Sequence, residues 1–431
     1  MKVKISRPTQ NVKSVGILIL AGIFSNSYFF PNFDSMNNRK LFFHHIGQTS
    51  PAPLALEIVK AEGCYLMDPQ GKRYLDLIGG ISVSNIGHRH PKVLQAIHNQ
   101  LEAYLHIMVY GELVQSPQVQ YAKLLTDHLP ASLNSVFFTA SGSEATEGAM
   151  KLAKRFTGRT KMFSFRNAYH GSTQGALSLI GSEYWKQAFR PLLPETYQLQ
   201  YNGMEDLALI DRQTACVIAE TIQAEAGVIV PEEKWLQALR KKCDETGALL
   251  VLDEIQCGFG RHGNLWAFEQ FGILPDILLT GKALGGGMPL GAFISDKRIM
   301  DSLSENPVLG HINTFGGHPV CCAAGMAAMN VLLEEKLMDV VKQKEELFLS
   351  LLKHPAIRSI RSCGLMISVE LEDFVMNKKL ICDLIEKGIF TDWFLFASHC
   401  LRIAPPLVIT EEEIRYAVGQ ILIALDELNR I

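Results

Sequence analysis

The stretch from Leu249 to Gly287 constrains the fold of this chain more than any other. It contains two short apolar runs, Leu249–Leu252 and Ile277–Leu279; Asp253 directly follows the first, and Lys282 follows the second within three residues. Short apolar runs bounded by turn residues are typical of strands buried in a parallel sheet. Ligands of such sheets bind at the carboxyl ends of the strands. We therefore expect Asp253 and Lys282 to face one crevice.

Asp253 and Lys282 together indicate a type of catalytic site that neither residue indicates alone. A lysine amine forms a Schiff base with a carbonyl cofactor such as pyridoxal phosphate. That cofactor withdraws electrons only while its pyridine nitrogen stays protonated, which a buried carboxylate ensures. The pair therefore predicts a pyridoxal-phosphate site, with the two side chains at opposite ends of one ring. The alternative is an ordinary acid at a strand end and an ordinary surface lysine.

Composition argues against several classes of protein. The chain has 431 residues, 48% of them hydrophobic and 20% charged, with a net charge of −3 and no long basic run. These values are ordinary for a globular protein and give nucleic-acid binding no electrostatic support. Nine cysteines without a C-x-x-C pattern indicate free thiols in a reducing compartment, which predicts a cytoplasmic protein. The histidines lack H-E-x-x-H spacing, so we expect no metal site.

The first 35 residues differ from the rest of the chain. A few basic residues precede the short apolar run Val15–Phe24, as in a signal peptide. This run is too short to span a membrane, and we expect no membrane attachment. The alternative is that Met36 is the true start and residues 1–35 lie upstream of it. Free thiols and an intracellular cofactor favour that alternative.

Alternating strand and helix patterns predict an α/β protein with a doubly wound, mostly parallel sheet. The candidate strands are Ser135–Phe138, Lys161–Phe165, Cys216–Ala219, Leu249–Leu252, Ile277–Leu279 and Ala292–Ser295. We expect residues 86–324 to form this large cofactor-binding domain. A hairpin pattern in residues 36–85 and short strands and helices in residues 325–431 predict a small α+β lobe built from both chain ends. Thr410 and Glu413 have the spacing of a capping box, which predicts the start of the final helix.

A second motif follows the strand Ser135–Phe138. Ser141, Gly142 and Ser143 come before an amphipathic helical pattern. Free backbone N–H groups at a helix start bind phosphate, and small residues let a phosphate approach closely. The motif therefore predicts a phosphate site one strand away from the Asp253–Lys282 crevice. The alternative is a simple serine cap of the helix.

The segment Gly258–Gly263 matches the letters of a G-x-G-x-x-G dinucleotide motif. In that motif the glycines open a helix directly after a strand. Here several residues separate the glycines from the preceding strand, and no helix pattern follows them. We therefore predict a loop, and keep a dinucleotide-binding protein as the alternative from a different functional class.

Three other residues are candidates for a binding role only when they are considered together with these motifs. Tyr169 follows the strand Lys161–Phe165, where an aromatic ring can stack on a planar cofactor, although a packed core tyrosine is the plainer interpretation. Arg402 has the side chain preferred for binding a substrate carboxylate. Glu225, like Arg402, lies in an unusual small-residue or proline-rich setting, but spacing alone indicates only a surface arginine at position 402.

With these motifs in place, the sequence resembles the class III (ω-amino) pyridoxal-phosphate-dependent aminotransferases, in the branch of acetylornithine and ornithine aminotransferases. The resemblance covers roughly residues 40–431. It rests on the motifs SGSEATEGAMKLAKRFTGR, AYHG, ETIQAEAGVIVP, LDEIQCGFGRHG, LLTGKALGGGMPLGA, HINTFGGHP and LRIAPPL, which occur in the family's order. It implies pyridoxal-phosphate transferase fold type I.

The resemblance also implies a role for each matching residue. Lys282 is implied to be the Schiff-base lysine and Asp253 the partner of the pyridine nitrogen. Glu225 and Arg402 are implied to form a gate, in which Glu225 pairs with Arg402 until 2-oxoglutarate needs the arginine. Thr314 is implied to reach the cofactor phosphate of a neighbouring subunit, hence a homodimer with shared active sites. The remaining implied cofactor contacts are Ser141, Gly142, Ser143, Tyr169, His170, Glu220 and Gln256.

The sequence departs from the family pattern at three positions. Ser172 stands where members that bind ornithine-like donors usually have an arginine for the donor carboxylate, which puts the identity of the donor in doubt. Thr221 replaces a usual proline, and His318 replaces a usual asparagine. We expect neither of these two changes to touch the chemistry.

These observations predict an aminotransferase that moves the amino group of an ω-amino donor, such as N-acetylornithine or ornithine, to 2-oxoglutarate by ping-pong chemistry. A decarboxylase or an aminomutase on the same fold is the alternative, because fold analogy cannot separate reactions of one cofactor. The implied Glu225–Arg402 gate favours amino transfer with glutamate as the other partner.

Overall fold

The computed structural model describes residues 37–428, so the expectations for residues 1–35 and for a start at Met36 lie outside the described residues. The chain divides into two compact units, Met1–Glu57 and Ile58–Ile431. In the first unit the described part contains α2 (Asn38–His45), which begins after Asn37, whose side chain accepts a hydrogen bond from the backbone N–H of Lys40 at 3.0 Å. The second unit contains all the predicted site residues.

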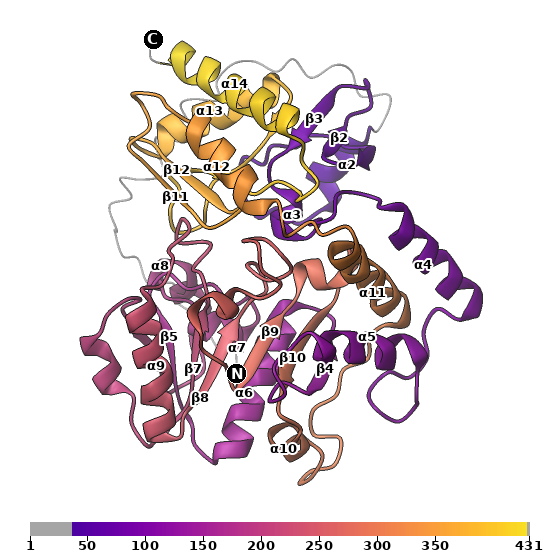
Figure 1. The fold of residues 1–431 in the computed structure, drawn as a ribbon, viewed down its shortest axis with the longest axis vertical. Coiled ribbons are helices and arrows are strands. Elements are labelled where there is room, and N and C mark those ends of the chain that lie inside the picture. Colours follow the sequence, from indigo (N-terminus) through magenta and orange to yellow (C-terminus); the bar gives the residue numbers. More distant parts are fainter. Residues whose placement is uncertain (1–36, 429–431) are drawn as a thin grey trace, which may run out of the picture. The chain divides into compact units, whose positions relative to one another are not determined.

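The largest sheet of the second unit has seven strands and lies in the lower part of Figure 1. Its strands pair in a parallel manner except for β10, which is antiparallel to both of its neighbours. The prediction of a mostly parallel sheet is therefore confirmed, although β6 and the direction of β10 were not foreseen. In spatial order the strands are β4 (Ser135–Thr139), β10 (Gly291–Ser295), β9 (Ile277–Thr280), β8 (Leu249–Asp253), β7 (Thr214–Glu220), β5 (Lys161–Phe165) and β6 (Thr196–Leu199).

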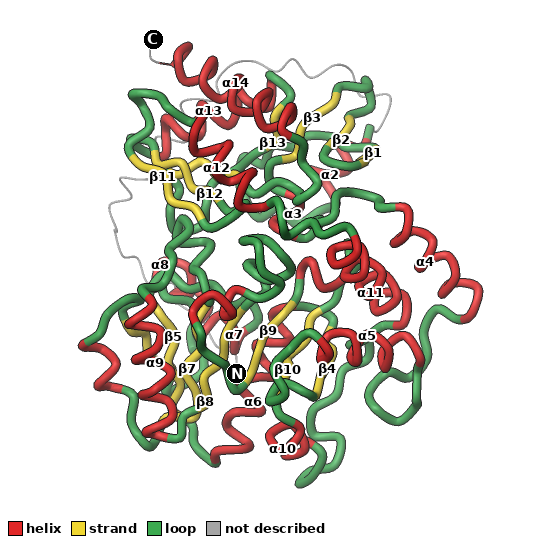
Figure 2. Tube along the Cα trace, in the orientation of Figure 1, coloured by secondary structure: helices red, strands yellow, loops and turns green. Residues whose placement is uncertain are grey.

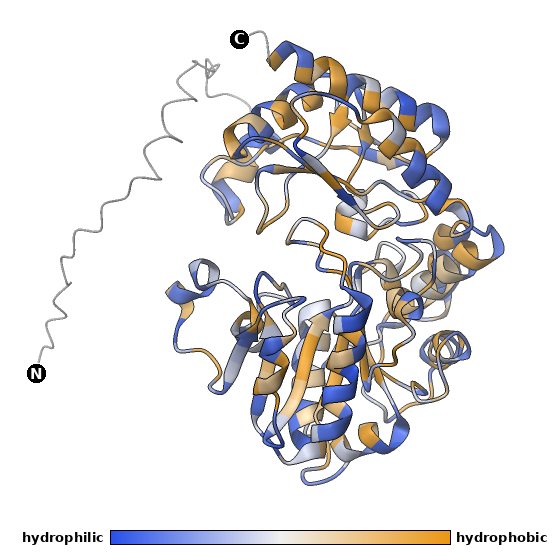
Figure 3. Cartoon of the chain, turned by 60° about the vertical axis from the view of Figure 1, so that its left-hand side comes forward, coloured by the Kyte–Doolittle hydropathy of each residue, from blue (hydrophilic) through white to orange (hydrophobic). Residues whose placement is uncertain are grey.

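Both faces of this sheet are buried, as a doubly wound fold requires. Side chains of β8 alternate between two separate cores, because successive residues of a strand point to opposite faces. Leu250 and Leu252 pack in the core that includes Trp235 of α9 (Glu233–Thr246), and Leu249 and Val251 pack in the core that includes side chains of α6 (Gly142–Thr157). Figure 3 shows the hydrophobic strands between helices whose outer faces are hydrophilic.

Two helix starts match the predicted capping signals. Ser141 Oγ accepts a hydrogen bond from the backbone N–H of Glu144 at 3.2 Å at the start of α6. At α14 (Glu411–Leu428), Glu413 N–H donates to Thr410 Oγ1 at 3.2 Å, and Thr410 N–H donates to Glu413 Oε2 at 2.9 Å. These reciprocal bonds satisfy backbone donors that a helix start otherwise leaves free.

Two smaller sheets complete the strands of the second unit. The predicted hairpin forms between β2 (Tyr65–Met67) and β3 (Arg73–Asp76), and β13 (Ile389–Phe390) pairs in parallel with β3. This pairing joins a segment near the C-terminus to one near the N-terminus, but the predicted domain boundaries stay a prediction. The other small-sheet strands are β1 (Lys60–Glu62), β11 (Ser359–Ser362), β12 (Ile367–Glu370) and β14 (Cys400–Ile403).

The short turn α3 (Gly79–Ser82) is left-handed. Its four residues have φ between 56° and 63°, including the non-glycine residues Ile81 and Ser82. Such a conformation costs L-residues about 1–2 kcal/mol each, so surrounding contacts must hold it. Asp76 supplies part of this support, because its Oδ1 accepts hydrogen bonds from the N–H groups of Ile78 and Gly79.

The remaining helices surround the sheets, as the tube view shows (Figure 2). The α-helices are α4 (Pro91–Ala103), α5 (Ser116–Asp127), α7 (Gln174–Leu179), α8 (Glu183–Lys186), α10 (Lys297–Met300), α11 (Pro319–Glu334), α12 (Val341–Leu351) and α13 (Phe374–Glu386). The 3-10 helices are η1 (Gln187–Phe189), η2 (Glu205–Leu209), η3 (Ala267–Phe271), η4 (Lys282–Gly285) and η5 (Asp301–Leu303). Within residues 37–428, no helix combines the length and the apolar character needed to cross a membrane.

Candidate active site

The carboxyl ends of three adjacent parallel strands form one crevice. β7 ends at Glu220, β8 ends at Asp253, and Lys282 follows the end of β9. A cavity of about 200 Å³ opens there, and it brings together every predicted cofactor-binding residue except Thr314. Its lining residues are Ser141, Gly142, Ser143, Tyr169, His170, Gly171, Glu220, Ile222, Asp253, Ile255, Gln256, Cys257 and Lys282.

Lys282 is held in the cavity in an unusual backbone conformation. Its φ of 46° lies in the left-handed region, which is strained for a residue with a side chain. Its Nζ donates a hydrogen bond to Gln256 Oε1 at 3.0 Å. Burial lowers the pKa of the Lys282 ammonium, and the carboxylates of Glu225 and Asp253 partly oppose that shift. A buried lysine with a lowered pKa is suited to act as a nucleophile or a base.

Asp253 is anchored by two hydrogen bonds. Its Oδ2 lies 2.7 Å from His170 Nδ1, and its Oδ1 accepts the backbone N–H of Ile255 at 2.9 Å. His170 is fully buried, and its Nε2 has no hydrogen-bond partner among the described residues. The pair leaves a fixed, desolvated carboxylate at the strand end, where it can stabilise a protonated ring nitrogen.

The small residues Ser141, Gly142 and Ser143 at the start of α6 line the cavity, and we call this helix start the cradle. A Cβ atom added at Gly171, whose φ is 123°, would lie 2.3 Å from Ser143 Oγ. A Cβ atom added at Gly142 would lie 3.0 Å from Ile255 Cδ1. Glycine is therefore required at position 171, and at position 142 a side chain would have to displace Ile255 slightly. The close approach of these segments places backbone N–H groups of a helix start at the cavity. Ser141 caps this helix, so the two interpretations of the motif are compatible.

Glu220 and Tyr169 form the wall next to Asp253. Glu220 accepts hydrogen bonds from the backbone N–H groups of Tyr169 and Ala224, both at 3.3 Å. Burial and the neighbouring charge of Asp253 raise the pKa of the Glu220 carboxyl well above its usual value. Burial also raises the pKa of the Tyr169 phenol, and a hydrogen bond with Ser172 partly offsets that shift.

Glu225 and Arg402 are in direct contact, although 177 residues separate them in the sequence. Arg402 Nη1 and Nη2 donate to Glu225 Oε1 and Oε2, each at 2.8 Å, and both residues are buried. Burial alone raises the pKa of Glu225, but Arg402 outweighs it and lowers that pKa below its usual value. The planar two-point contact has the geometry in which an arginine binds a carboxylate most strongly.

The structure adds Asp392 to this pair. Asp392 Oδ1 lies 2.8 Å from Arg402 Nε, whereas Glu225 contacts the two terminal nitrogens of the guanidinium. Burial raises the pKa of the Asp392 carboxyl to about 6, against the opposing effect of Arg402. The guanidinium also stacks 4.6 Å from the ring centre of Phe394. Sequence reasoning missed Asp392 because an isolated acid between short strands gives no signal.

Thr314 lies apart from the cavity. Its side chain is exposed, and its carbonyl oxygen lies 2.8 Å from Nε2 of His106. Thr314 therefore does not line the cavity formed by its own chain. This placement is compatible with a role in the site of another subunit, which stays a prediction.

The glycine motif Gly258–Gly263 forms a loop, as predicted. Phe259, Gly260 and Gly263 have positive φ values of 58°, 84° and 104°, and no helix begins there. Arg261 is fully buried and donates to the backbone oxygens of Leu365 and Pro405. The loop is therefore tied to other segments of the chain and lacks the helix start of a dinucleotide site.

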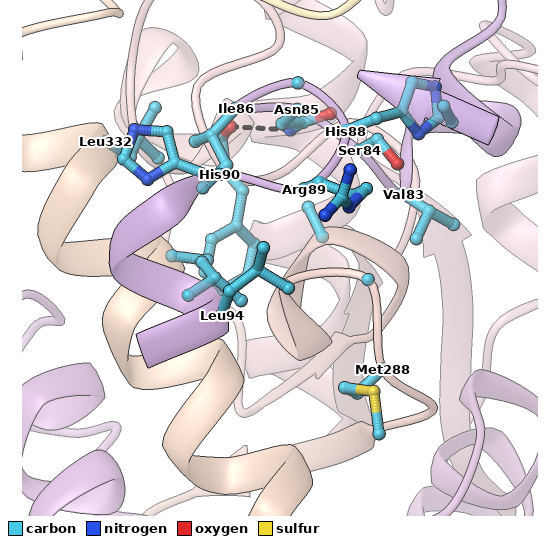
Figure 4. A pocket seen from close by; sticks show the side chains of 18 of the residues that line it. Val83, Ser84, Asn85, Ile86, His88, Arg89, His90, Leu94, Met288 and Leu332 are labelled. Carbon is cyan, nitrogen blue, oxygen red and sulfur yellow. Dashed lines mark hydrogen bonds between the residues drawn. The ribbon is translucent and has the colours of Figure 1, made fainter. Parts of the chain in front are cut away.

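A second cavity, of about 270 Å³, adjoins the segment that follows Lys282 (Figure 4). Ala283 lines it, as do Arg89 and His90 at the start of α4. The rest of the lining is largely apolar, and Figure 4 shows Leu94 and Met288 on one side of it. Sequence reasoning assigned no function to these residues.

Comparison with known proteins identifies the family. The family model Aminotransferase class-III matches residues 46–425. The chain is 38% identical to acetylornithine aminotransferase of Methanopyrus kandleri over 387 residues, which is 89% of this chain and 97% of that protein. It is 40% identical to the [LysW]-aminoadipate semialdehyde/glutamate semialdehyde transaminase of Sulfurisphaera tokodaii over 322 residues, 73% and 82% of the two chains.

A solved structure gives the same result. The ornithine aminotransferase of Toxoplasma gondii superposes with a TM-score of 0.84 at 30% identity, over 90% of this chain and 93% of that one, and its structure has partial occupancy of PLP at the active site. The chain therefore belongs to the class III aminotransferases. It is a pyridoxal-phosphate-dependent aminotransferase of fold type I.

The residues of the crevice fit this cofactor. A buried amine on Lys282 suits its aldehyde, the anchored carboxylate of Asp253 suits its pyridine nitrogen, and the small-residue helix start at Gly142 suits its phosphate. The unpartnered Nε2 of His170 leaves a polar atom available inside the same cavity. The prediction of a pyridoxal-phosphate enzyme is confirmed, whereas the roles of individual residues stay predictions.

Proposed function

We propose that this enzyme transfers the terminal amino group of an ω-amino donor to 2-oxoglutarate, in two half-reactions at one site. The observation that carries the proposal is the buried two-point contact between Arg402 and Glu225, with both N–O distances at 2.8 Å. Arg402 offers the fork that a carboxylate of 2-oxoglutarate or glutamate needs. Glu225 neutralises that fork while a donor without a matching carboxylate is bound, because an unpaired buried charge is costly.

We assign the proton transfer to Lys282. Its Nζ takes the proton from the donor carbon that bears the amine, and its lowered pKa increases the neutral fraction that a base requires. Asp253, fixed by His170, would hold a proton on the pyridine nitrogen, and the start of α6 would bind the phosphate. When bound, pyridoxal phosphate supplies the electron sink for this chemistry. Gln256 orients Lys282 through their 3.0 Å hydrogen bond.

The residues near Tyr169 leave several amine donors open. Ser172 stands where related ornithine-binding enzymes usually have an arginine, and a serine hydroxyl offers no charge to a donor carboxylate. We therefore leave N-acetylornithine, ornithine, lysine, putrescine and 4-aminobutyrate as the candidates. The names of the relatives in Methanopyrus and Sulfurisphaera support a donor with a terminal amine.

We also propose a homodimer with shared active sites. Exposed apolar side chains gather in two segments next to Thr314: Leu101, Leu105, Ile107, Met108, Leu113, Val114, Val308, Leu309, Ile312 and Phe315. The two segments are joined, because His106 Nε2 lies 2.8 Å from Thr314 O and Gln118 Nε2 donates to Gly317 O at 2.7 Å. Clustered exposed apolar side chains support a subunit interface there, with Thr314 in it.

We place the enzyme in the cytosol, because all nine cysteines are free thiols in the described structure and most are buried. A decarboxylase or aminomutase on the same fold is the competing function. Each candidate amine, incubated with 2-oxoglutarate and the purified holoenzyme, separates the functions. Glutamate formed in proportion to consumed amine supports the proposal, whereas carbon dioxide or an isomerised amine without glutamate contradicts it.

A further inference from the structure

Helix α6 is attached to the loop that contains Thr314 as well as to the chain's own phosphate cradle. Lys151 Nζ lies 2.9 Å from His311 Nδ1 and donates to Gly310 O at 3.3 Å. One turn further along, Arg155 donates to the backbone oxygens of Ser302 and Glu305 at 3.2 and 3.0 Å. The helix whose first residues line the cofactor cavity therefore also fixes the approach to Thr314.

One oxygen atom joins the two features directly. Glu144 Oε2 accepts the backbone N–H of Ala140 at 2.9 Å, which closes the turn that leads into the cradle. The same oxygen accepts Asn313 Nδ2 at 3.3 Å. Glu144 N–H also donates to the cap Ser141 at 3.2 Å. Glu144 therefore connects the turn before Gly142 to the residue that precedes Thr314.

Asn313 fixes the loop on the other side of Thr314 as well. Its Oδ1 accepts the backbone N–H of Gly316, and a Cβ atom added at Gly316 would lie 2.1 Å from that oxygen. The carbonyl oxygen of Thr314 is held by His106 at 2.8 Å. The backbone around Thr314 is thus fixed while its side chain points to solvent. Within residues 37–428, no hydrogen bond of the Thr314 hydroxyl is formed.

We propose that Asn313 is a positioning residue that holds Thr314 for the cofactor phosphate of the partner subunit, through its bond to the Glu144 carboxylate of its own subunit. This inference rests on the proposed dimer with shared sites. The bond between Asn313 and Glu144 fixes the distance between two parts of one subunit. One part is the cradle of its own site, and the other is the Thr314 hydroxyl that reaches the site of the partner subunit. Without the bond between Asn313 and Glu144, the loop that contains Thr314 must become ordered when the phosphate binds. The entropy lost in that ordering weakens phosphate binding.

Cofactor binding to the apo-dimer tests the inference by absorbance titration. Asn313→Ala removes the bond to Glu144 and also the acceptor of the Gly316 N–H, so it should weaken pyridoxal phosphate by at least about three- to tenfold, the range expected for one net hydrogen bond. It should leave the binding of pyridoxal unchanged, because pyridoxal lacks the phosphate. Asn313→Asp removes the donor and adds a second negative charge beside Glu144, so it should weaken pyridoxal phosphate more than Asn313→Ala does. Asn264→Ala, an exposed asparagine elsewhere, is the matched control and should bind as the wild type does.

A double-mutant cycle checks that Glu144 is the partner. The double variant Glu144→Ala with Asn313→Ala should lose less affinity for pyridoxal phosphate than the sum of the two single losses, because both single variants remove the same bond between Asn313 and Glu144. Fully additive losses would overturn the connection. So would a wild-type affinity in Asn313→Ala, an equal loss for pyridoxal, or a monomeric mass of Asn313→Ala in light scattering.

Thr314→Ala separates this inference from the proposed function. If Thr314→Ala binds pyridoxal phosphate as the wild type does, the role of Thr314 in the shared site is wrong and the inference falls with it. If Thr314→Ala weakens binding and Asn313→Ala does not, the shared site stands and only the positioning role of Asn313 is overturned.

Discussion

Removing either member of the Glu225–Arg402 pair should change the rates of the two half-reactions by different amounts. Glu225→Ala frees the Arg402 fork, so the half-reaction with glutamate should hold or improve and the half-reaction with the ω-amine should slow. Arg402→Ala removes the fork itself. It should weaken the glutamate half-reaction by about 2–5 kcal/mol, as expected when a buried charge-paired contact is lost. That energy corresponds to a fall in its kcat/KM of roughly thirtyfold to several-thousandfold.

Asp392 predicts an asymmetry in stability between the same two variants. In Glu225→Ala, Arg402 keeps Asp392 at 2.8 Å and the carbonyl oxygen of Trp393 at 2.9 Å. We expect a loss of about 1–3 kcal/mol, less than the roughly 3–5 kcal/mol for a fully orphaned buried ion. In Arg402→Ala two carboxylates lose their common partner. Arg402→Ala should therefore be the less stable variant.

Single-turnover spectroscopy of the bound cofactor measures each half-reaction separately, and denaturant unfolding of the same samples measures stability. Gln237→Ala, an exposed substitution far from the crevice in sequence, serves as the control for handling. Equal losses in both half-reactions for both variants would refute the gate and leave the pair as a structural ion pair.

Four further predictions concern the crevice and Glu254, the buried residue that follows Asp253. Lys282→Ala should lose nearly all turnover and the absorbance band that shifts on addition of amine; wild-type turnover would contradict its role. Asp253→Asn should fold but react slowly at saturating cofactor, since an amide cannot keep the pyridine nitrogen protonated; an unchanged rate would remove Asp253 from that role. Mixing Lys282→Ala with Thr314→Ala subunits should restore one intact site per hybrid dimer; no gain in activity would argue against shared sites. Burial raises the pKa of Glu254 from 4.5 to about 7, against hydrogen bonds from Ala267, Phe268 and Thr221, so the folded protein binds that proton more tightly than the unfolded chain. The stability that this group contributes is therefore present below about pH 4.5 and lost towards pH 7, by up to about 3 kcal/mol. Unfolding of Glu254→Gln across this range should lack that slope, and an unchanged slope would contradict the assignment.

The crevice was predictable because the order of strands in a parallel sheet determines which strand-end residues lie close together. A parallel strand that ends in a functional residue brings that residue to the same edge as its neighbours. Asp253 and Lys282 each follow a buried apolar run, and β8 and β9 are adjacent in the sheet. Capping signals at Ser141 and Thr410 were equally local, so they too predicted the observed helix starts.

Other features had no local signal. Ile81, Ser82 and Lys282 adopt positive φ values that their side chains disfavour, so only tertiary contacts can impose them. Asp392 meets Arg402 through the packing of separate segments of the chain. The antiparallel direction of β10 is seen only in its pairing with β4 and β9, and its own residues give no signal for it. Asn313 is one polar residue in a loop until its bond to Glu144 is seen.

Transfer of an isotope-labelled ω-nitrogen tests the central claim most directly. The holoenzyme is incubated with 2-oxoglutarate and with its best amine donor, labelled with heavy nitrogen at the terminal amine, and the glutamate is analysed by mass spectrometry. The account predicts labelled glutamate in an amount equal to the consumed donor, and none with Lys282→Ala. Unlabelled glutamate, or consumption of the donor without any glutamate, would contradict it.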